Sequence, residues 1–401
     1  MTAPTAPATA SFAVPPLTWL YVPGDRPAVV VKALASGADA VVIDLEDAVA
    51  ADRKPYALRA TAELLAEGRP VTPASAPGPA IHVRVNALTG PYAATEIRAL
   101  AALPALAGLR LPKVNGSADI HRAAAWAATA GPGTAGPGSI APGNANPDHA
   151  NPDHASPGGA APGSAIPGSA NPGSAAPGGT APGRAAPEPM APGQTAPEQP
   201  SSWQTAPERT SPRQTASKRA APGSPAPESP AAVPPLHALL ETALGVENAF
   251  AVATAHPALC GLSLGEADLR AELGVRDEDG LGWARGRTVI AARAAGLPPP
   301  PQSVFPDVRD TEALALSCAR GRALGFLGRA ALHPRQLPVI ERAYLPTAEE
   351  VARAMETVQA AAAGAGACAL PDGRFVDPAV VAAARRVLTL AARGPRCGEE
   401  R

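Results

Sequence analysis

Two acidic residues at the ends of hydrophobic runs have the type and spacing for metal chemistry. Glu241 ends the run HALLET, and Asp268 follows the next hydrophobic run in LSLGEADL. Carboxylates at the mouths of two adjacent strands form an oxygen-rich site, and Mg²⁺ prefers one or two carboxylates completed by water and substrate oxygens. The alternative for Asp268 is that it caps the helix that follows. The spacing therefore predicts a Mg²⁺ site at Glu241 and Asp268.

A second acidic group lies in DLEDAV, which places Asp44, Glu46 and Asp47 at the end of an earlier hydrophobic run. Strand alternation turns Asp44 and Glu46 to the same face, and buried carboxylates require partners. These acids are candidates for orienting metal-bound water. The alternative for Asp47 is that it begins the next helix.

Two basic residues lie within or at the end of hydrophobic runs. Arg84 stands between two valines in IHVRVN, and its planar fork matches a carboxylate or an enolate oxygen. A structural pairing of Arg84 with Asp44 or Glu46 is an alternative that is compatible with that function. Lys113 in LPKV would neutralise nearby acids, whereas a Schiff-base role would require burial and a lowered pKa.

Eight hydrophobic runs alternate with Ala-rich amphipathic stretches, which is the pattern of a TIM (β/α)8 barrel. No GxGxxG follows the first run, so the dinucleotide-binding doubly wound fold is not predicted. The carboxyl ends of barrel strands converge on one face, so we expect the separate charged residues to form one cluster. The predicted strands are residues 17–23, 40–46, 81–86, 109–114, 237–242, 260–265, 302–306 and 325–332.

A long Ala/Pro/Gly-rich stretch interrupts this pattern at residues 131–232. It holds 22 of the 50 prolines and 15 of the 38 glycines of the 401-residue chain, and we expect it to be a disordered insertion. The repeat NPDHANPDHA within it carries His149 and His154, which are either a fragment of a metal site or a low-complexity duplication. The predicted organisation is a barrel in two parts, 13–130 and 233–345, followed by a C-terminal segment, 346–395.

Composition argues against several classes of partner. The formal net charge of −1 gives no global field for nucleic acid or an anionic membrane. The four cysteines are scattered without a CxxC pair, which argues against a disulfide framework or structural zinc. The sequence has no secretory signal pattern and no run of 18 or more apolar residues. We therefore expect a cytoplasmic enzyme with no nucleic-acid or membrane partner.

Nine sequence motifs in the same order give the chain a family resemblance over residues 17–125 and 236–390. The chain resembles the citrate lyase β-subunit-like, or CoA ester lyase, branch of the HpcH/HpaI aldolase superfamily. The motifs are LYVPGDRP, KALASGADAVVIDLEDAVAADRK, VRVN, LPKV, LLETALGVENA, LSLGEADLRAELG, WARGRTVIAARAAGL, LGFLGRAALHPRQ and GRFVDPAVV.

The resemblance implies roles for individual residues. Glu241 and Asp268 match the Mg²⁺ ligands, and Glu46 and Asp47 match acids that act near the metal through water. Arg84 matches an arginine that contacts an acid or carbonyl oxygen of the substrate. The residues implied in the substrate and CoA pocket, besides Arg84, are Tyr21, Pro23, Gly24, Lys113, His333 and Gln336.

The C-terminal segment carries a further implied role. Asp377 matches an aspartate that acts as acid and base on the acyl-CoA carbon, and in relatives it reaches the site of a neighbouring subunit. The resemblance therefore implies a helical lid at 346–395 and a homotrimer or hexamer.

The implied activity is that of a Mg²⁺-dependent lyase. It would cleave or form a 3-hydroxyacyl-CoA, such as malyl-, citramalyl- or citryl-CoA, with acetyl-CoA and a 2-oxo acid as the products. The alternatives are a malate-synthase-like or thioester-hydrolysing relative, a citrate lyase β subunit acting on a carrier-protein thioester, and a non-catalytic interaction protein. The chain departs from the family in three places. It reads Pro16-Leu17 where the family usually has an arginine just before the first strand, and AGLPPPPQSVFP lacks its usual acid; both changes are expected to alter the pocket and the CoA contacts. The third departure is the insertion, which lies before the fifth strand.

Overall fold

The computed structural model of the chain describes residues 15–67, 78–129, 233–363, 368–369 and 373–393. All of these residues belong to one compact unit, which comprises Met1–Pro142 and Pro227–Arg401. The predicted insertion at 131–232, with His149 and His154, lies outside the described residues.

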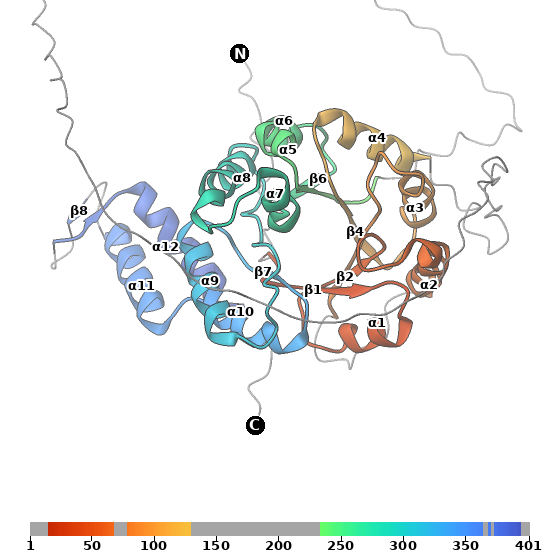
Figure 1. Cartoon of the computed structure of the whole chain (residues 1–401). Helices are drawn as coiled ribbons and strands as arrows, with labels where there is room; N and C mark the ends of the chain where they lie inside the picture. The colour runs from red at the N-terminus through yellow and green to blue at the C-terminus, as the bar shows by residue number, and fades with distance from the viewer. Residues whose placement is uncertain (1–14, 68–77, 130–232, 364–367, 370–372, 394–401) are drawn as a thin grey trace, which may run out of the picture. The chain divides into compact units, whose positions relative to one another are not determined.

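Seven parallel strands form the main sheet, in the order β6-β5-β4-β3-β2-β1-β7. Consecutive strands β1 to β6 are neighbours, and the last strand returns to pair with the first, as the barrel pattern predicts. Figure 1 shows the strands with the helices on their outer side. The strands are β1 (Thr18–Pro23), β2 (Ala40–Asp44), β3 (Ala80–Arg84), β4 (Leu106–Leu111), β5 (Leu236–Leu240), β6 (Leu259–Leu264) and β7 (Arg329–Ala331).

The connections between strands are helical, as parallel pairing requires. Apolar residues at helical spacing give these helices a buried face; in α3, for example, Ala93, Ile97 and Leu100 are buried. The helices of the sheet region are α1 (Pro27–Leu34), α2 (Lys54–Ala66), α3 (Ala93–Leu100), α4 (Ser117–Ala128), α5 (Ala243–Glu247), α6 (Ala249–Ala253), α7 (Glu266–Leu273), α8 (Gly282–Ala294), α9 (Thr311–Ala323) and α10 (Leu337–Tyr344). Short 3₁₀ turns are Ala51–Arg53, Asp279–Leu281 and Pro334–Gln336.

Strand alternation divides the core into two layers. In β2, Val41 and Ile43 belong to the large cluster between the sheet and the helices. Val42 belongs instead to a small cluster inside the sheet, with Trp19 and Ala330. Successive side chains of a strand point to opposite faces, so the residues that alternate with the outer core face the interior. The interior face is therefore the one that carries the polar residues at the strand ends.

The prediction of eight strands in a barrel is confirmed in part. The segment predicted as a strand at 302–306 forms only a single parallel bridge, between Gln302 and Arg329. Four prolines precede Gln302, and a proline has no N–H to donate to a ladder. The backbone also passes close to β1 at Gly328, just before β7. The φ of Gly328 is +80°, and a Cβ there would lie 2.4 Å from the Leu17 carbonyl oxygen, so this position requires glycine. The described residues therefore form a seven-stranded parallel half-barrel.

The C-terminal segment contains two helices, α11 (Ala348–Ala363) and α12 (Pro378–Ala391). Between them in the chain lie two short antiparallel strands, β8 (Cys368–Ala369) and β9 (Phe375–Val376). The two helices pack against each other. Beyond α12, Arg393 lies 2.5 Å from Asp39 and 3.2 Å from Glu341, which ties the end of the segment to the sheet region. The structure does not confirm the predicted lid.

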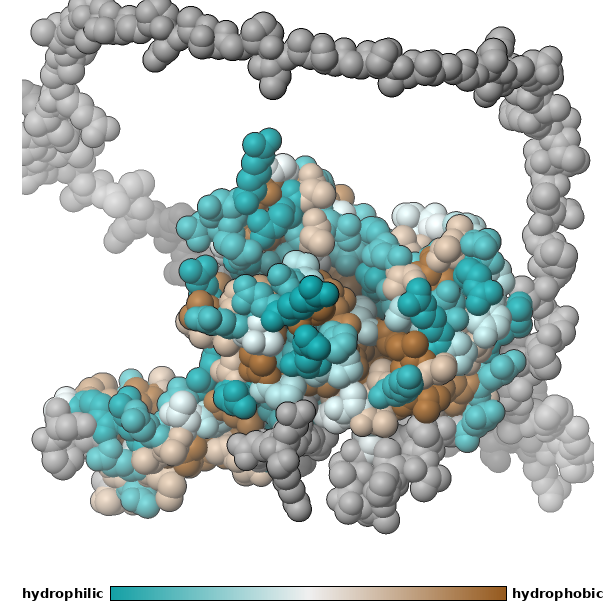
Figure 2. All heavy atoms as spheres, turned by 60° about the horizontal axis from the view of Figure 1, so that its bottom comes forward, coloured by the Kyte–Doolittle hydropathy of each residue, from teal (hydrophilic) through white to brown (hydrophobic). Residues whose placement is uncertain are grey.

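Hydrophilic and hydrophobic residues are interspersed on the face drawn in Figure 2. Within the described part of the chain, no helix has the length and apolar character needed to cross a bilayer.

Candidate active site

A cavity of about 480 Å³ lies among the residues at the carboxyl ends of the strands. Parallel strands that alternate with helices bring these ends together on one face, as the sequence predicts. Polar residues from β2 and β3, from the position after β5 and from the first turn of α7 reach it, so acids far apart in the sequence share one space. The charged and polar lining residues are Tyr21, Asp44, Asp47, Arg84, Arg110, Glu241, Ser263, Asp268, Gln302 and Ser303.

Arg84 holds the acids after β2 in place. Its Nε and Nη2 donate to the two oxygens of Asp44 at 2.8 and 2.6 Å, a bidentate pair. Its Nη1 lies 3.0 Å from a carboxylate oxygen of Glu46 and 3.0 Å from one of Asp47. Burial disfavours the charge of Arg84, but the bonds to Asp44 outweigh this and raise its pKa above the usual range. The structural pairing anticipated for Arg84 is thus present.

Asp44 also shapes the turn that follows β2. Its two oxygens accept the backbone N–H groups of Glu46 and Ala48 at 2.9 and 3.2 Å. Side chains of this type favour such local turns because they replace the lost ladder bonds. The turn aims Glu46 and Asp47 at Arg84 and Lys113.

Lys113 is a permanent cation of the site. Its Nζ lies 3.1 Å from Glu46 and 3.8 Å from Asp47. Burial lowers the pKa of Lys113, but the bond to Glu46 and the charges of the surrounding acids together outweigh burial and raise this pKa above its ordinary value. Burial raises the pKa of Glu46 in turn, with Arg84 and Lys113 opposing it. A Schiff-base role for Lys113 is disfavoured, since its ammonium form is stabilised.

Glu241 is anchored by the backbone on one side and by a glycine on the other. Lys113 has φ of +51°, in the left-handed region, and its N–H donates to Glu241 Oε2 at 3.0 Å. A Cβ on Gly265 would lie 2.3 Å from Glu241 Cγ, so only glycine leaves room for this side chain. Glu241 is 3% exposed. Burial raises its pKa to about 7, and the charges of Glu46 and Asp268 act in the same direction.

Asp268 lies at the rim of the same cavity, in the first turn of α7, and its side chain is exposed. It is not the cap of that helix, since Gly265 occupies the N-cap position. Glu241 and Asp268 are thus two carboxylates facing one cavity, the donor set that suits Mg²⁺. The described residues contain no group of three or more His, Cys, Asp or Glu arranged for a metal. Water and substrate oxygens would complete the coordination.

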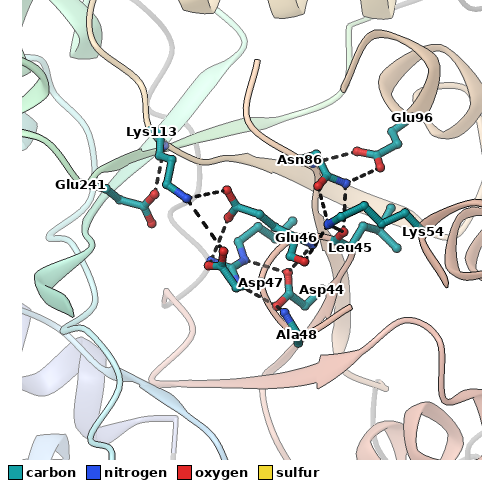
Figure 3. A network of polar contacts seen from close by, with 11 residues as sticks. Asp44, Leu45, Glu46, Asp47, Ala48, Lys54, Asn86, Glu96, Lys113 and Glu241 are labelled. Atoms are coloured by element: carbon teal, nitrogen blue, oxygen red, sulfur yellow. Dashed lines mark hydrogen bonds and ion pairs between the residues drawn. The ribbon is translucent and has the colours of Figure 1, made fainter. Parts of the chain in front are cut away.

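A network behind the acids fixes their position, as Figure 3 shows. Lys54 Nζ donates to the carbonyl oxygens of Leu45 and Glu46 at 2.9 and 2.8 Å, and to Asn86 Oδ1 at 2.6 Å. Asn86 in turn donates to Glu96 through its backbone N–H and its side chain. Burial raises the pKa of Glu96 to about 7. The turn after β2 is therefore supported from outside the cavity.

Of the other residues predicted for the pocket, some line the cavity and some lie outside its lining. Tyr21 and Pro23 line the cavity. Gly24 lies next to it, packed on β2, where a Cβ would meet Leu45 at 2.8 Å. His333 is exposed and caps the turn at Pro334–Gln336.

Gln336 and Asp377 have roles in the local structure outside the cavity lining. Gln336 is 1% exposed and binds the N–H of Leu332 at 2.8 Å and the carbonyl of Phe305 at 3.0 Å. Asp377 is the N-cap of α12 and accepts the N–H of Val380 at 2.8 Å.

Four polar residues of the lining were not singled out from the sequence: Arg110, Ser263, Gln302 and Ser303. Arg110 carried the same signal as Arg84, a cation between two hydrophobic residues in a predicted strand. Serine and glutamine at strand positions carry no such signal, since either residue is common in loops and caps.

The fold and the site together define a parallel α/β protein whose charged residues gather at the carboxyl ends of its strands. The family model described as HpcH/HpaI aldolase/citrate lyase matches residues 17–334, and the chain belongs to this family. The resemblance recognised in the sequence is thereby confirmed.

Curated relatives in this family include both a thioesterase and lyases. A (3S)-malyl-CoA thioesterase of Cereibacter sphaeroides (strain KD131 / KCTC 12085) is 36% identical over 164 residues, covering 39% of this chain and 56% of the relative. The citrate lyase subunit beta of Leuconostoc mesenteroides subsp. cremoris is 32% identical over 169 residues, covering 40% of this chain and 55% of the relative. The match thus spans about half the length of these curated relatives.

A solved structure shares the fold. The crystal structure of protein CitE from Mycobacterium tuberculosis, in complex with magnesium, acetoacetate and coenzyme A, aligns with a TM-score of 0.58 at 24% identity. The alignment covers 94% of this chain and 99% of that chain.

Proposed function

We propose that the chain is a Mg²⁺-dependent carbon–carbon lyase that acts on a short 3-hydroxyacyl-CoA and yields acetyl-CoA and a 2-oxo acid. The observation that carries this proposal is that Glu241 and Asp268 face the same cavity as the guanidinium of Arg84. Membership in the family and the magnesium in the related CitE structure support the choice of metal.

The charge of the site supports a divalent cation. Among the described residues, the five carboxylates of Asp44, Glu46, Asp47, Glu241 and Asp268 outnumber the three cations of this region, Arg84, Lys113 and Arg110. An excess of buried negative charge is costly unless a cation compensates it. Glu241 and Asp268 would hold Mg²⁺, and the bound ion would act as a Lewis acid that lowers the pKa of a coordinated hydroxyl.

The protein side chains have distinct tasks in the reaction. Cleavage breaks the bond between the hydroxyl-bearing carbon and the carbon next to the thioester. The hydroxyl loses its proton, and the second carbon must gain one to become the methyl group of acetyl-CoA. Arg84, fixed by its carboxylates, supplies positive potential where negative charge develops. Glu46 and Asp47 would orient water at the metal.

Asp377 is the proposed proton donor to that carbon. Within its own chain it caps α12 and does not line the cavity, so we assign it to the site of a neighbouring subunit in a homotrimer or hexamer. The expected pocket for CoA and substrate includes Tyr21 and Pro23. Asp377→Ser would remove the carboxylate but keep a capping hydroxyl. This variant should lose exchange of the acetyl-CoA methyl protons without losing stability, and retained exchange would exclude the role.

The direct test is a mass-spectrometric screen of malyl-, citramalyl- and citryl-CoA with Mg²⁺ present and then chelated. Glu241→Gln and Asp268→Asn should abolish both turnover and Mg²⁺ binding, whereas Glu349→Gln, an exposed acid of α11, should change neither. Turnover that survives chelation would refute the proposal.

A thioesterase is the second candidate, because the malyl-CoA thioesterase is 36% identical over the matched segment. A thiol-reactive dye distinguishes the two activities, since hydrolysis releases free CoA and lyase cleavage does not. A carrier-protein substrate, suggested by the citrate lyase relative, would leave free CoA esters uncleaved by the purified chain.

A further inference from the structure

Arg110 is a buried cation with no carboxylate partner among the residues that the structure describes. It is 2% exposed, lies in β4 and lines the cavity. Its Nη2 donates to Ser263 Oγ at 2.7 Å, while its Nε and Nη1 have no hydrogen-bond partner within the described residues. A buried guanidinium with two unmade hydrogen bonds is costly, and such a group is expected to have an acceptor.

Carboxylates line the same cavity as Arg110, but none that the structure describes forms a hydrogen bond or ion pair with it. Its guanidinium lies 4.9 Å from the ring centre of Trp19 and 5.9 Å from that of Tyr21. His82 and His237 are nearby, and burial, reinforced by the positive charge of Arg110, lowers the pKa of both. Neutral rings, a hydroxyl and a cavity thus enclose a cation. Arg84, its register partner on β3, has three carboxylates instead.

The position of Arg110 relative to the acid pair sets the size of the missing acceptor. Ser263, which accepts the Arg110 hydrogen bond, precedes Gly265 by two residues, and a Cβ on Gly265 would lie 2.3 Å from Glu241 Cγ. Residues two apart in a strand are separated by about 6–7 Å. A four-carbon dicarboxylate has the length to place one carboxylate at the Mg²⁺ that Glu241 and Asp268 would hold, and the other at Arg110.

We propose that Arg110 binds a second carboxylate of the substrate, so that the 2-oxo acid handled at this site is a dicarboxylate and not glyoxylate or pyruvate. This inference rests on the proposed function for the metal end of the ligand. Arg110 offers the carboxylate one of its two unpaired donors, Nε or Nη1, and Ser263 and the two aromatic rings hold its guanidinium in place. Arg84 cannot substitute for it, because its fork is already occupied by Asp44.

The test compares (S)-malate with (S)-lactate, which share the 2-hydroxy acid end and differ only in the second carboxylate. Titration calorimetry with Mg²⁺-saturated protein should give malate binding about 10- to 100-fold tighter than lactate binding, the range of a hydrogen-bonded charge pair. Arg110→Met should abolish this preference, and Arg110→Lys should retain part of it. Equal binding of the two acids, or no binding of malate, would overturn the inference.

Two further measurements separate the possible failures. Titration with Mg²⁺ alone tests the proposed metal site, so loss of Mg²⁺ binding counts against the proposed function and intact Mg²⁺ binding without malate preference counts against Arg110. A purely structural Arg110 would lower the thermal stability when replaced by Met and leave malate affinity unchanged. The ligand role predicts the reverse: unchanged or higher stability, because an unpaired buried charge is removed, with weaker malate binding.

Discussion

Gly265→Ala is expected to displace the acidic side chain that anchors the metal site. The added Cβ would lie 2.3 Å from Glu241 Cγ and 2.7 Å from Glu241 Oε1, far inside the separation of about 3.5–4.0 Å at which non-bonded carbon atoms attract. The backbone at Gly265 has φ of −91°, which alanine adopts readily, so the perturbation is purely steric. Glu241 must therefore rotate, and its hydrogen bond from the Lys113 N–H is lost.

Two magnitudes follow from this displacement. Overpacking of a buried position costs about 1–3 kcal/mol of unfolding free energy. Even the loss of a group that merely orients a metal ligand weakens metal affinity by about 10- to 100-fold, so the displacement of a ligand should cost at least as much. Titration calorimetry with Mg²⁺ measures the affinity, and urea denaturation measures the stability.

Gly261→Ala is the matched control for Gly265→Ala. Gly261 is four residues earlier in β6, and its added Cβ would lie 2.7 Å from His237 Nδ1, a comparable clash that does not involve the acids. We expect a similar loss of stability and an unchanged Mg²⁺ affinity. A folded Gly265→Ala protein that binds Mg²⁺ as the wild type does would refute the assignment of Glu241, as would an equal loss in the control.

Three further predictions concern the surroundings of the site. Arg84→Met leaves three carboxylates without their guanidinium and should lower the unfolding free energy by about 3–5 kcal/mol, measured by urea denaturation. Lys54→Met removes three hydrogen bonds to the turn after β2 and should cost about 1–3 kcal/mol; an unchanged urea midpoint would exclude this supporting role. Burial lowers the pKa of His82 from 6.5 to about 3, so the unfolded state takes up the proton first as pH falls and stability is lost below pH 6.5. His82→Phe keeps a ring but cannot titrate. Between pH 7 and pH 5 its unfolding free energy should therefore fall by ~2 kcal/mol less than that of the wild type. Identical pH profiles of the two proteins would contradict the neutral state of His82.

Much of the fold follows from local features of the sequence. Seven hydrophobic runs became strands close to their predicted positions, because each is short, apolar and bounded by an amphipathic helix. The run at 302–306 did not become a full strand, since the preceding prolines restrict its ladder to the one bridge at Gln302. The positions of Asp44, Glu241 and Asp268 at strand ends were also predictable, since parallel strands share one carboxyl edge.

The sequence alone could not distinguish the two arginines of the sheet interior. Arg84 and Arg110 both stand between hydrophobic residues, in neighbouring strands at the same register. Arg84 is neutralised because β2 lies beside β3 and presents Asp44 and the turn after it. Arg110 has β5 on its other side, where the register partner is the neutral His237. Which of the two guanidinium groups is paired with carboxylates therefore depends on strand order and register, and these are set by the packing of the whole sheet.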